Sequence, residues 1–128
     1  VRQVFGIVKQ ARDAAVELVQ QARRTGQTIR GFEVDDVARS IIRAAGYGDY
    51  FRHRTGHSIG EQVHSTGANM DNLETHDERE VLPGTCFSIE PGIYLPEFGV
   101  RSEVNVYVEE NDARVTGRVQ NDIVRILS

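Results

Sequence analysis

Three short segments of the sequence carry side chains that could do chemistry. In the first, His57 lies between two glycines in the run Thr55–Gly60, and glycine lets a backbone come close to a ligand. In the second, Glu90 ends a short apolar run, and a glutamate in such surroundings is rarely buried unless it is paired or binds a metal. In the third, Arg101 and Glu103 are two residues apart on a predicted strand, so both side chains point to the same face.

Each segment also has a plainer interpretation when it is taken alone. A single histidine such as His57 is usually structural or simply exposed. Glu90 is equally well explained as an exposed strand end before a turn, and Ser88, on the same strand face, is placed to orient it. Arg101 and Glu103 read as a surface ion pair, which contributes little energy.

The combination of the three segments is more informative. Glu90 and Glu103 are expected on neighbouring strands, where their carboxylates converge and His57 adds a nitrogen. Two adjacent carboxylates repel and raise each other's pKa unless a cation lies between them. One imidazole with two carboxylates suits manganese, iron, cobalt or zinc better than calcium or magnesium, and three protein ligands leave positions open for catalysis.

Two amphipathic helices are predicted ahead of these segments. The first begins near the N-terminus and ends before Gly26, and the second runs from Val34 to Ala45 and ends at Gly46. Their apolar faces are formed by residues three and four apart: Val1, Val4, Phe5, Val8, Ala11, Ala15, Leu18 and Ala22, then Val34, Val37, Ala38, Ile41, Ile42 and Ala45. Neither helix carries an obvious reactive group, so both are interpreted as helices that cover a core.

Strands are predicted in the last third of the chain, over residues 85–90, 100–108, 115–118 and 123–127. The polar stretch 65–80 lacks periodicity and is expected to be a long surface loop that forms one rim of a cleft. Two helices on a mostly antiparallel sheet make an α+β fold. Residues 1–128 are expected to form one domain, or part of a larger one.

Composition excludes several classes of protein. The net charge is −4, and the densest basic patch, Arg52 to Arg54, is interpreted as a solvated turn beside a site rather than a nucleic-acid contact. No apolar run is long enough to cross a membrane. The single cysteine, Cys86, cannot form an intrachain disulfide, which favours a reducing, cytoplasmic setting.

The three segments, taken in order, resemble the pita-bread metallopeptidases of family M24. The matching runs are Thr55–Gly60 with a second histidine at His64, Ser88–Tyr94, and Gly99–Glu103, and the helix pair with Gly46-Tyr47-Gly48 also fits. The Glu-Pro-Gly-Ile-Tyr and Gly-Val-Arg runs are similar to the Xaa-Pro branch, which contains Xaa-Pro dipeptidase (prolidase) and Xaa-Pro aminopeptidase.

The resemblance implies a site with two divalent ions. In it, His57 and Glu90 bind one ion and Glu103 bridges both, while Glu90 also moves a proton from the attacking water to the leaving nitrogen. His64 is expected to donate a hydrogen bond to the substrate carbonyl or the developing oxyanion, and Arg101 to steer Glu103 or line the substrate pocket. Manganese is the first expectation, with cobalt, zinc or iron as alternatives. The implied substrate is a proline-containing peptide, and the implied assembly is a homodimer.

Some features depart from the family pattern. The family has two further aspartate ligands on a hairpin before the helix pair, and Asp13, Asp35 and Asp36 do not fit that pattern. The chain is therefore expected to be the C-terminal part of the catalytic domain and inactive alone. Ser65 and Val104 also stand where the family often has acidic residues. Two alternatives stay open: a catalytically inactive binding module of the same fold, and a metal-free hydrolase similar to creatinase.

Overall fold

The computed structural model describes residues 1–60 and 67–117. Two helices come first: α1 spans Arg2–Thr25 and α2 spans Gly31–Ala44. Gly26 follows α1 with φ 72°, the left-handed conformation that glycine adopts most easily at a helix end. The two predicted helices are thus confirmed, although α2 begins earlier than the spacing indicated. Neither helix has the length and apolarity needed to cross a bilayer within the described ranges.

The strands form one four-stranded and one two-stranded antiparallel sheet. The larger sheet has the order β1-β2-β5-β6, and its strands are Ser58–Ile59, Cys86–Ile89, Val104–Val108 and Ala113–Thr116. The smaller sheet pairs β3, Gly92–Tyr94, with β4, Gly99–Arg101. A short 3-10 helix, η1, spans Gly48–Tyr50.

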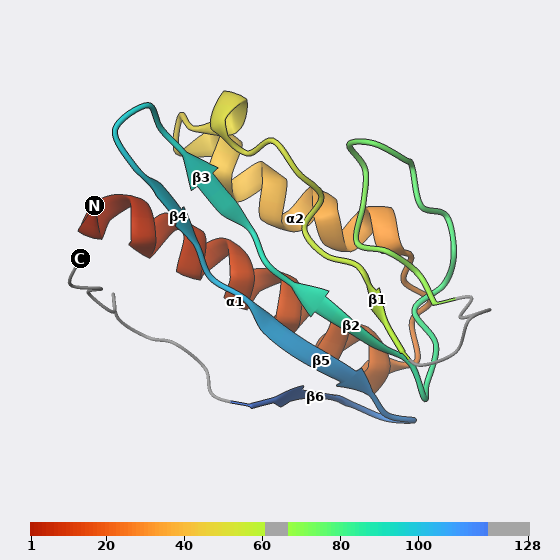
Figure 1. Cartoon of the computed structure of the whole chain (residues 1–128). Coiled ribbons are helices and arrows are strands. Elements are labelled where there is room, and N and C mark those ends of the chain that lie inside the picture. Colours follow the sequence, from red (N-terminus) through yellow and green to blue (C-terminus); the bar gives the residue numbers. More distant parts are fainter. Residues whose placement is uncertain (61–66, 118–128) are drawn as a thin grey trace.

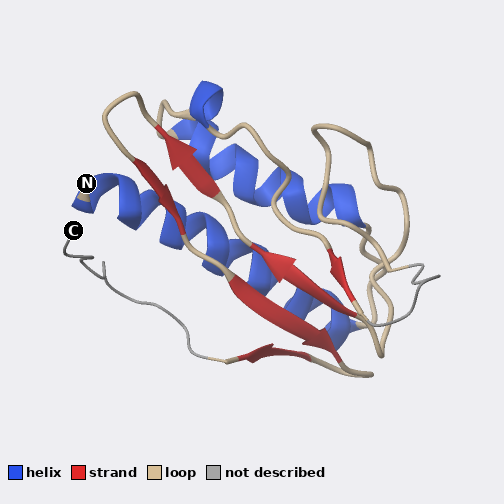
Figure 2. Ribbon diagram, in the orientation of Figure 1, coloured by secondary structure: helices blue, strands red, loops and turns tan. Residues whose placement is uncertain are grey.

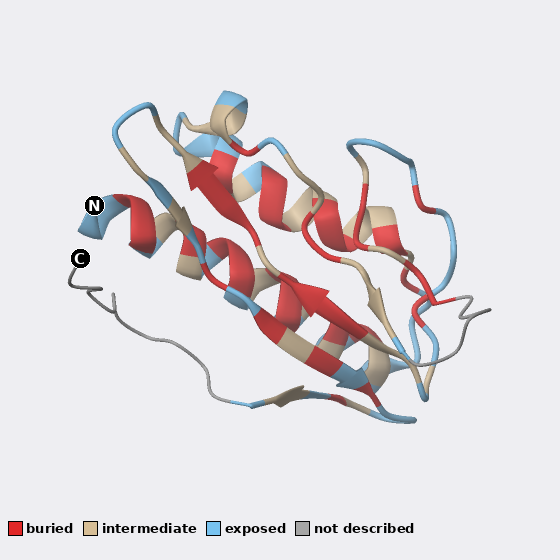
Figure 3. Ribbon diagram, viewed as in Figure 1, coloured by how far each residue is buried: buried red, intermediate tan, exposed pale blue. Residues whose placement is uncertain are grey.

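Both helices pack on one side of the strands, so the chain forms two layers (Figures 1 and 2). Figure 3 shows that the buried stripes of α1 and α2 face the sheet and that the central strands β2 and β5 are largely buried. Phe87 and Ile89 of β2 and Val106 of β5 lie in the same apolar cluster as Val8 of α1 and Ile42 of α2. This arrangement confirms the predicted α+β fold.

The predicted apolar stripes of the helices are partly wrong. On α1, Val16 and Val19 are buried, whereas Val1 is exposed and Leu18 is only half-buried. On α2, Ala45 is exposed, because the helix ends before it. Three charged residues are also buried on the helices, contrary to the interpretation of both as plain covering helices: Arg12, Asp35 and Arg39.

The predicted strand over residues 100–108 is divided in the structure. β4 ends at Arg101 and β5 begins at Val104, so Ser102 and Glu103 lie between them. The predicted alternation still holds across the break, because Ser102 and Val104 are buried whereas Arg101 and Glu103 are exposed. The last strand seen is Ala113–Thr116, and the predicted strand over 123–127 lies outside the described residues.

The long loop before β2 is not simply a surface loop. Its described part, 67–80, has no helix or strand, but Asp71 and Asp77 are buried within it. The Asp77 carboxylate accepts hydrogen bonds from the backbone of Asn69 and from the backbone and side chain of Arg79. Burial works to raise the pKa of Asp77, but these hydrogen bonds and the Arg79 charge outweigh it and lower that pKa. Hydrogen bonds to the buried Asp77 carboxylate therefore hold this part of the loop, which has no helix or strand.

Candidate functional site

The two glutamates meet where the larger sheet passes into the β3–β4 hairpin. Ile89 of β2 pairs with Val104 of β5, so Glu90 leaves β2 opposite the point where Glu103 enters β5. Ser102 N also donates to Pro91 O at 3.3 Å, which keeps the two segments together beyond the paired ends of β2 and β5. Glu90 and Glu103 were predicted on neighbouring strands, but each lies one residue outside a strand, next to the paired ends of β2 and β5.

His57 reaches the same place because its backbone lies tightly against β2. A Cβ on Gly56 would come within 1.7 Å of the Ser88 carbonyl oxygen, so only glycine allows this approach. Ser88 N donates to His57 O at 2.9 Å, and His57 N donates to Ser88 Oγ at 3.0 Å. The Ser88 hydroxyl therefore fixes the His57 backbone, rather than orienting Glu90 as the alternation suggested.

The side chains of the three segments approach one another in pairs. His57 Nε2 lies 3.6 Å from Glu90 Oε2, and Arg101 Nη1 lies 3.9 Å from Glu90 Oε1. Glu90 is 16% exposed, whereas His57 is 43% exposed, so the carboxylate is set deeper than the imidazole. The structure thus places Glu90 at the centre of the cluster, with His57 and Arg101 on its two oxygens.

The other charged groups of the cluster shift the pKa of Glu103. Glu103 is exposed as a whole residue, but partial desolvation of its carboxylate, the negative charge of Glu90 and a hydrogen bond from protonated Glu103 to Glu90 together raise the pKa of Glu103. The positive charges of Arg101 and His57 oppose this rise without cancelling it. Two carboxylates held this close are more stable with a proton or a cation between them.

This donor set fits a divalent transition-metal ion in its chemistry. An imidazole and two carboxylates are ligands of manganese, iron, cobalt and zinc, and an ion between Glu90 and Glu103 would relieve their repulsion. Within residues 1–60 and 67–117, however, no group of three or more His, Cys, Asp or Glu side chains is spaced to hold an ion. His57, Glu90 and Glu103 therefore converge without forming a closed metal cage.

Two further residues join the cluster that the sequence interpretation missed. His53 Nε2 lies 2.9 Å from Tyr94 Oη, and the two rings meet edge to face with centroids 5.4 Å apart. Burial raises the pKa of the Tyr94 hydroxyl, with the Glu90 charge adding to the rise and Arg101 opposing it. His53 was interpreted as part of a solvated basic turn, but it is half-buried against Tyr94. The histidine four residues before His57 was the available signal.

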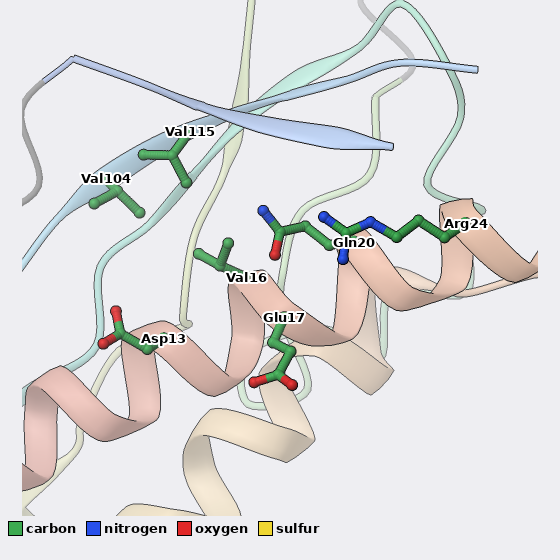
Figure 4. Close-up of a pocket in the computed structure, with 7 residues that line it drawn as sticks. All are labelled: Asp13, Val16, Glu17, Gln20, Arg24, Val104 and Val115. Atoms are coloured by element: carbon green, nitrogen blue, oxygen red, sulfur yellow. The ribbon is translucent and has the colours of Figure 1, made fainter. Parts of the chain in front are cut away.

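One predicted site residue is not placed, since His64 lies outside the described residues. A hollow elsewhere in the fold is also separate from the cluster. It lies between α1 and the strands β5 and β6, where Asp13 and Val16 face Val104 and Val115 (Figure 4). Its lining includes none of the residues of the cluster. The chemistry is thus concentrated at a sheet end and not in this hollow.

Comparison with known proteins gives consistent results. A family profile described as metallopeptidase family M24 matches residues 1–110. The chain is 36% identical over 124 residues to an Xaa-Pro dipeptidase of Pyrococcus furiosus, covering 96% of this chain and 33% of that protein. It is 44% identical over 103 residues to an Xaa-Pro dipeptidase of Lactobacillus helveticus, covering 80% of this chain and 25% of that protein. The chain thus spans between a quarter and a third of the length of these relatives.

Solved structures show the same similarity in three dimensions. A dipeptidase structure from Pyrococcus horikoshii superposes with a TM-score of 0.77 at 35% sequence identity. The superposition covers 94% of this chain and 32% of that one. The helix pair and the antiparallel strands are therefore an arrangement already known in a larger enzyme structure.

Proposed function

Because the chain belongs to metallopeptidase family M24 and has the α+β architecture of its pita-bread fold, we propose that it contributes to a metal-dependent exopeptidase that acts on Xaa-Pro peptides. Support for the substrate class comes from the relatives that are named Xaa-Pro dipeptidases. In this proposal residues 1–128 are the C-terminal part of a catalytic domain. Two aspartate ligands, which the family resemblance implies, complete the metal site from outside this chain.

The observation that carries the proposal is the convergence of His57, Glu90 and Glu103. They come from three separate segments, yet Glu90 lies 3.6 Å from the imidazole and is close enough to Glu103 for its negative charge to raise the pKa of Glu103. A structural ion pair would not need two carboxylates side by side, since they repel. A site for a cation does need them.

Each residue of the cluster has a role that its position supports. His57 offers its Nε2 nitrogen, while Nδ1, 3.1 Å from Ser58 O, is held in place by the backbone. Glu103 would help to hold the divalent ions through its carboxylate. Divalent ions, when bound, supply a water of lowered pKa and polarise the scissile carbonyl. Glu90 would take a proton from the attacking water on its carboxylate and deliver it to the leaving nitrogen.

Substrate contacts are proposed for the residues around Glu90. Arg101 is half exposed and close to Glu90, so it is placed to orient the carboxylate and to line the substrate pocket. Tyr94 and His53 form the adjoining wall through their hydrogen bond. His64, a residue outside the described ranges, remains the proposed donor to the substrate carbonyl or oxyanion.

Metal analysis of a Glu103→Ala variant tests the proposal. The full-length protein is purified with its metal, and metal content is compared with hydrolysis of an Xaa-Pro dipeptide. We expect Glu103→Ala to lose bound metal and activity together, because the bridging carboxylate is gone. The matched control is Glu109→Ala, which removes an exposed carboxylate just past the opposite end of β5 and should keep both. Wild-type metal content in Glu103→Ala would rule out the bridging role.

A further inference from the structure

A buried ion pair on α2 lies behind the candidate site. Asp35 and Arg39 are one helical turn apart, with side chains 0% and 8% exposed. Arg39 Nε donates to Asp35 Oδ2 at 2.9 Å and Arg39 Nη2 donates to Asp35 Oδ1 at 3.1 Å. A buried pair is weak evidence for stability, because removing two charges from water offsets most of their attraction. Its partners are therefore more informative than its energy.

The aspartate holds the segment that leads to His57. Asp35 Oδ1 accepts hydrogen bonds from Thr55 N at 2.9 Å and from Thr55 Oγ1 at 2.7 Å. Asp35 Oδ2 also accepts one from Asn72 N at 3.2 Å, so the long loop is tied to the same carboxylate. One carboxylate thus joins α2, the start of the His57 segment and the loop.

The arginine holds the same segment further upstream. Arg39 Nη1 donates to Phe51 O at 3.0 Å, and Arg39 Nη2 donates to His53 O at 2.8 Å. The guanidinium also lies over the Phe51 ring, 4.1 Å from its centroid. A flat fork of donors can make these contacts together, whereas the single ammonium of lysine cannot.

The held segment is directly connected to the candidate ligands. Thr55 O accepts a hydrogen bond from Glu90 N at 2.6 Å, and His57 lies two residues further on. We propose that Asp35 and Arg39 are positioning residues, which set the place of the His57 segment against Glu90 and hold His53 beside Tyr94. This inference rests on the proposed function, since it concerns the same site, but the positioning itself can be measured without any metal.

Amide hydrogen exchange and metal binding, measured side by side, test the inference. The variants are Asp35→Asn, which replaces an acceptor oxygen by a donor, and Arg39→Lys, which keeps the charge and removes the fork. Val34→Ala on the same helix is the control, because it weakens a fully buried contact without touching the pair. Exchange is read at the Thr55 and Glu90 amides, and metal binding by titration with Co²⁺.

We expect exchange at both amides to become at least about tenfold faster in Asp35→Asn than in Val34→Ala, at matched global stability. Co²⁺ affinity should fall about 10–100-fold, as is usual when a residue that orients a metal ligand is lost. Arg39→Lys should show the same pattern more weakly, and it keeps the test decisive if Asp35→Asn does not fold.

The outcomes separate this inference from the proposed function. If both variants change exchange at Thr55 and Glu90 no more than Val34→Ala does, the positioning role is overturned. If exchange responds as expected but the unmodified protein binds no Co²⁺, positioning stands and the proposed metal site fails. If Co²⁺ binds equally well to all forms while exchange changes, the pair does not position the metal ligands.

Discussion

The close approach of Gly56 to β2 gives a sharp test of how the site is held. Replacing Gly56 with alanine adds a Cβ at 1.7 Å from Ser88 O and 2.7 Å from Ser88 C, and both are backbone atoms. Real Cβ contacts essentially never fall below 3.0 Å, so the two segments must move apart by at least 1.3 Å. A flexible side chain could move aside, but here the contact atoms belong to the backbone, so the two segments must separate.

The cost can be worked out from the contacts that this movement breaks. The hydrogen bonds from Ser88 N to His57 O and from His57 N to Ser88 Oγ are 2.9 and 3.0 Å long, so a shift of this size breaks both. Each contributes about 1 kcal/mol, and overpacking adds about 1–3 kcal/mol. Alanine offsets about 0.4–1 kcal/mol of this loss, because it lowers the conformational entropy of the unfolded chain relative to glycine. We therefore expect Gly56→Ala to lower the free energy of unfolding by about 2–5 kcal/mol.

Urea unfolding followed by far-ultraviolet circular dichroism measures this loss. Gly6→Ala is the matched control, because Gly6 lies within α1 and a Cβ there meets no atom within 4 Å. That substitution should raise stability by about 0.5–1 kcal/mol, since alanine favours a helix interior over glycine. The reasoning fails if Gly56→Ala unfolds at the wild-type urea concentration, or if both variants lose equal stability.

Two further perturbations test charges inside the fold. The pKa of Asp77 is lowered, so its stabilisation is present above the unfolded pKa of about 4 and is lost as pH falls through the folded pKa. The free energy of unfolding, measured with urea at pH 7 and pH 3, should therefore fall less between these pH values in Asp77→Asn than in wild type. An equal fall would show that the Asp77–Arg79 contact does not stabilise the fold. Ser102→Ala removes the acceptor of a 2.8 Å bond from buried Arg12 and should cost about 1–3 kcal/mol. Ser40→Ala, an exposed serine on α2, should stay within about 0.5 kcal/mol of wild type in the same measurement.

Much of the fold follows from patterns within short windows of sequence. Apolar residues three and four apart predicted both helices, and glycines at their ends marked where they stop. Alternation from Val100 to Val108 predicted two opposite faces, one of which is the more buried in the structure, but it did not predict that the strand breaks at Ser102. At this break Arg12 Nη1 donates a hydrogen bond to Ser102 Oγ, although the two residues lie 90 positions apart in the sequence. A local pattern cannot contain such a contact.

The candidate site divides in the same way. Residue type and motif order alone predicted His57, Glu90, Arg101 and Glu103, and the structure brings them together as expected, while their roles remain proposals. His53 escaped notice because its partner is Tyr94, 41 residues away in the sequence.

Periodicity and residue type were enough to predict both helices, the approximate positions of several strands and the side chains able to do chemistry. Which charges are buried, and which groups they bind, depends instead on how distant segments pack together. In the sequence, Asp35 is an acidic residue near the start of a predicted helix, where its charge alone would explain its presence. Its burial, and its bonds to Thr55 and Asn72, come from packing α2 against segments 20 and 37 residues further along the chain. Sequence distance hides such partners, because hydrogen bonds depend on proximity in space.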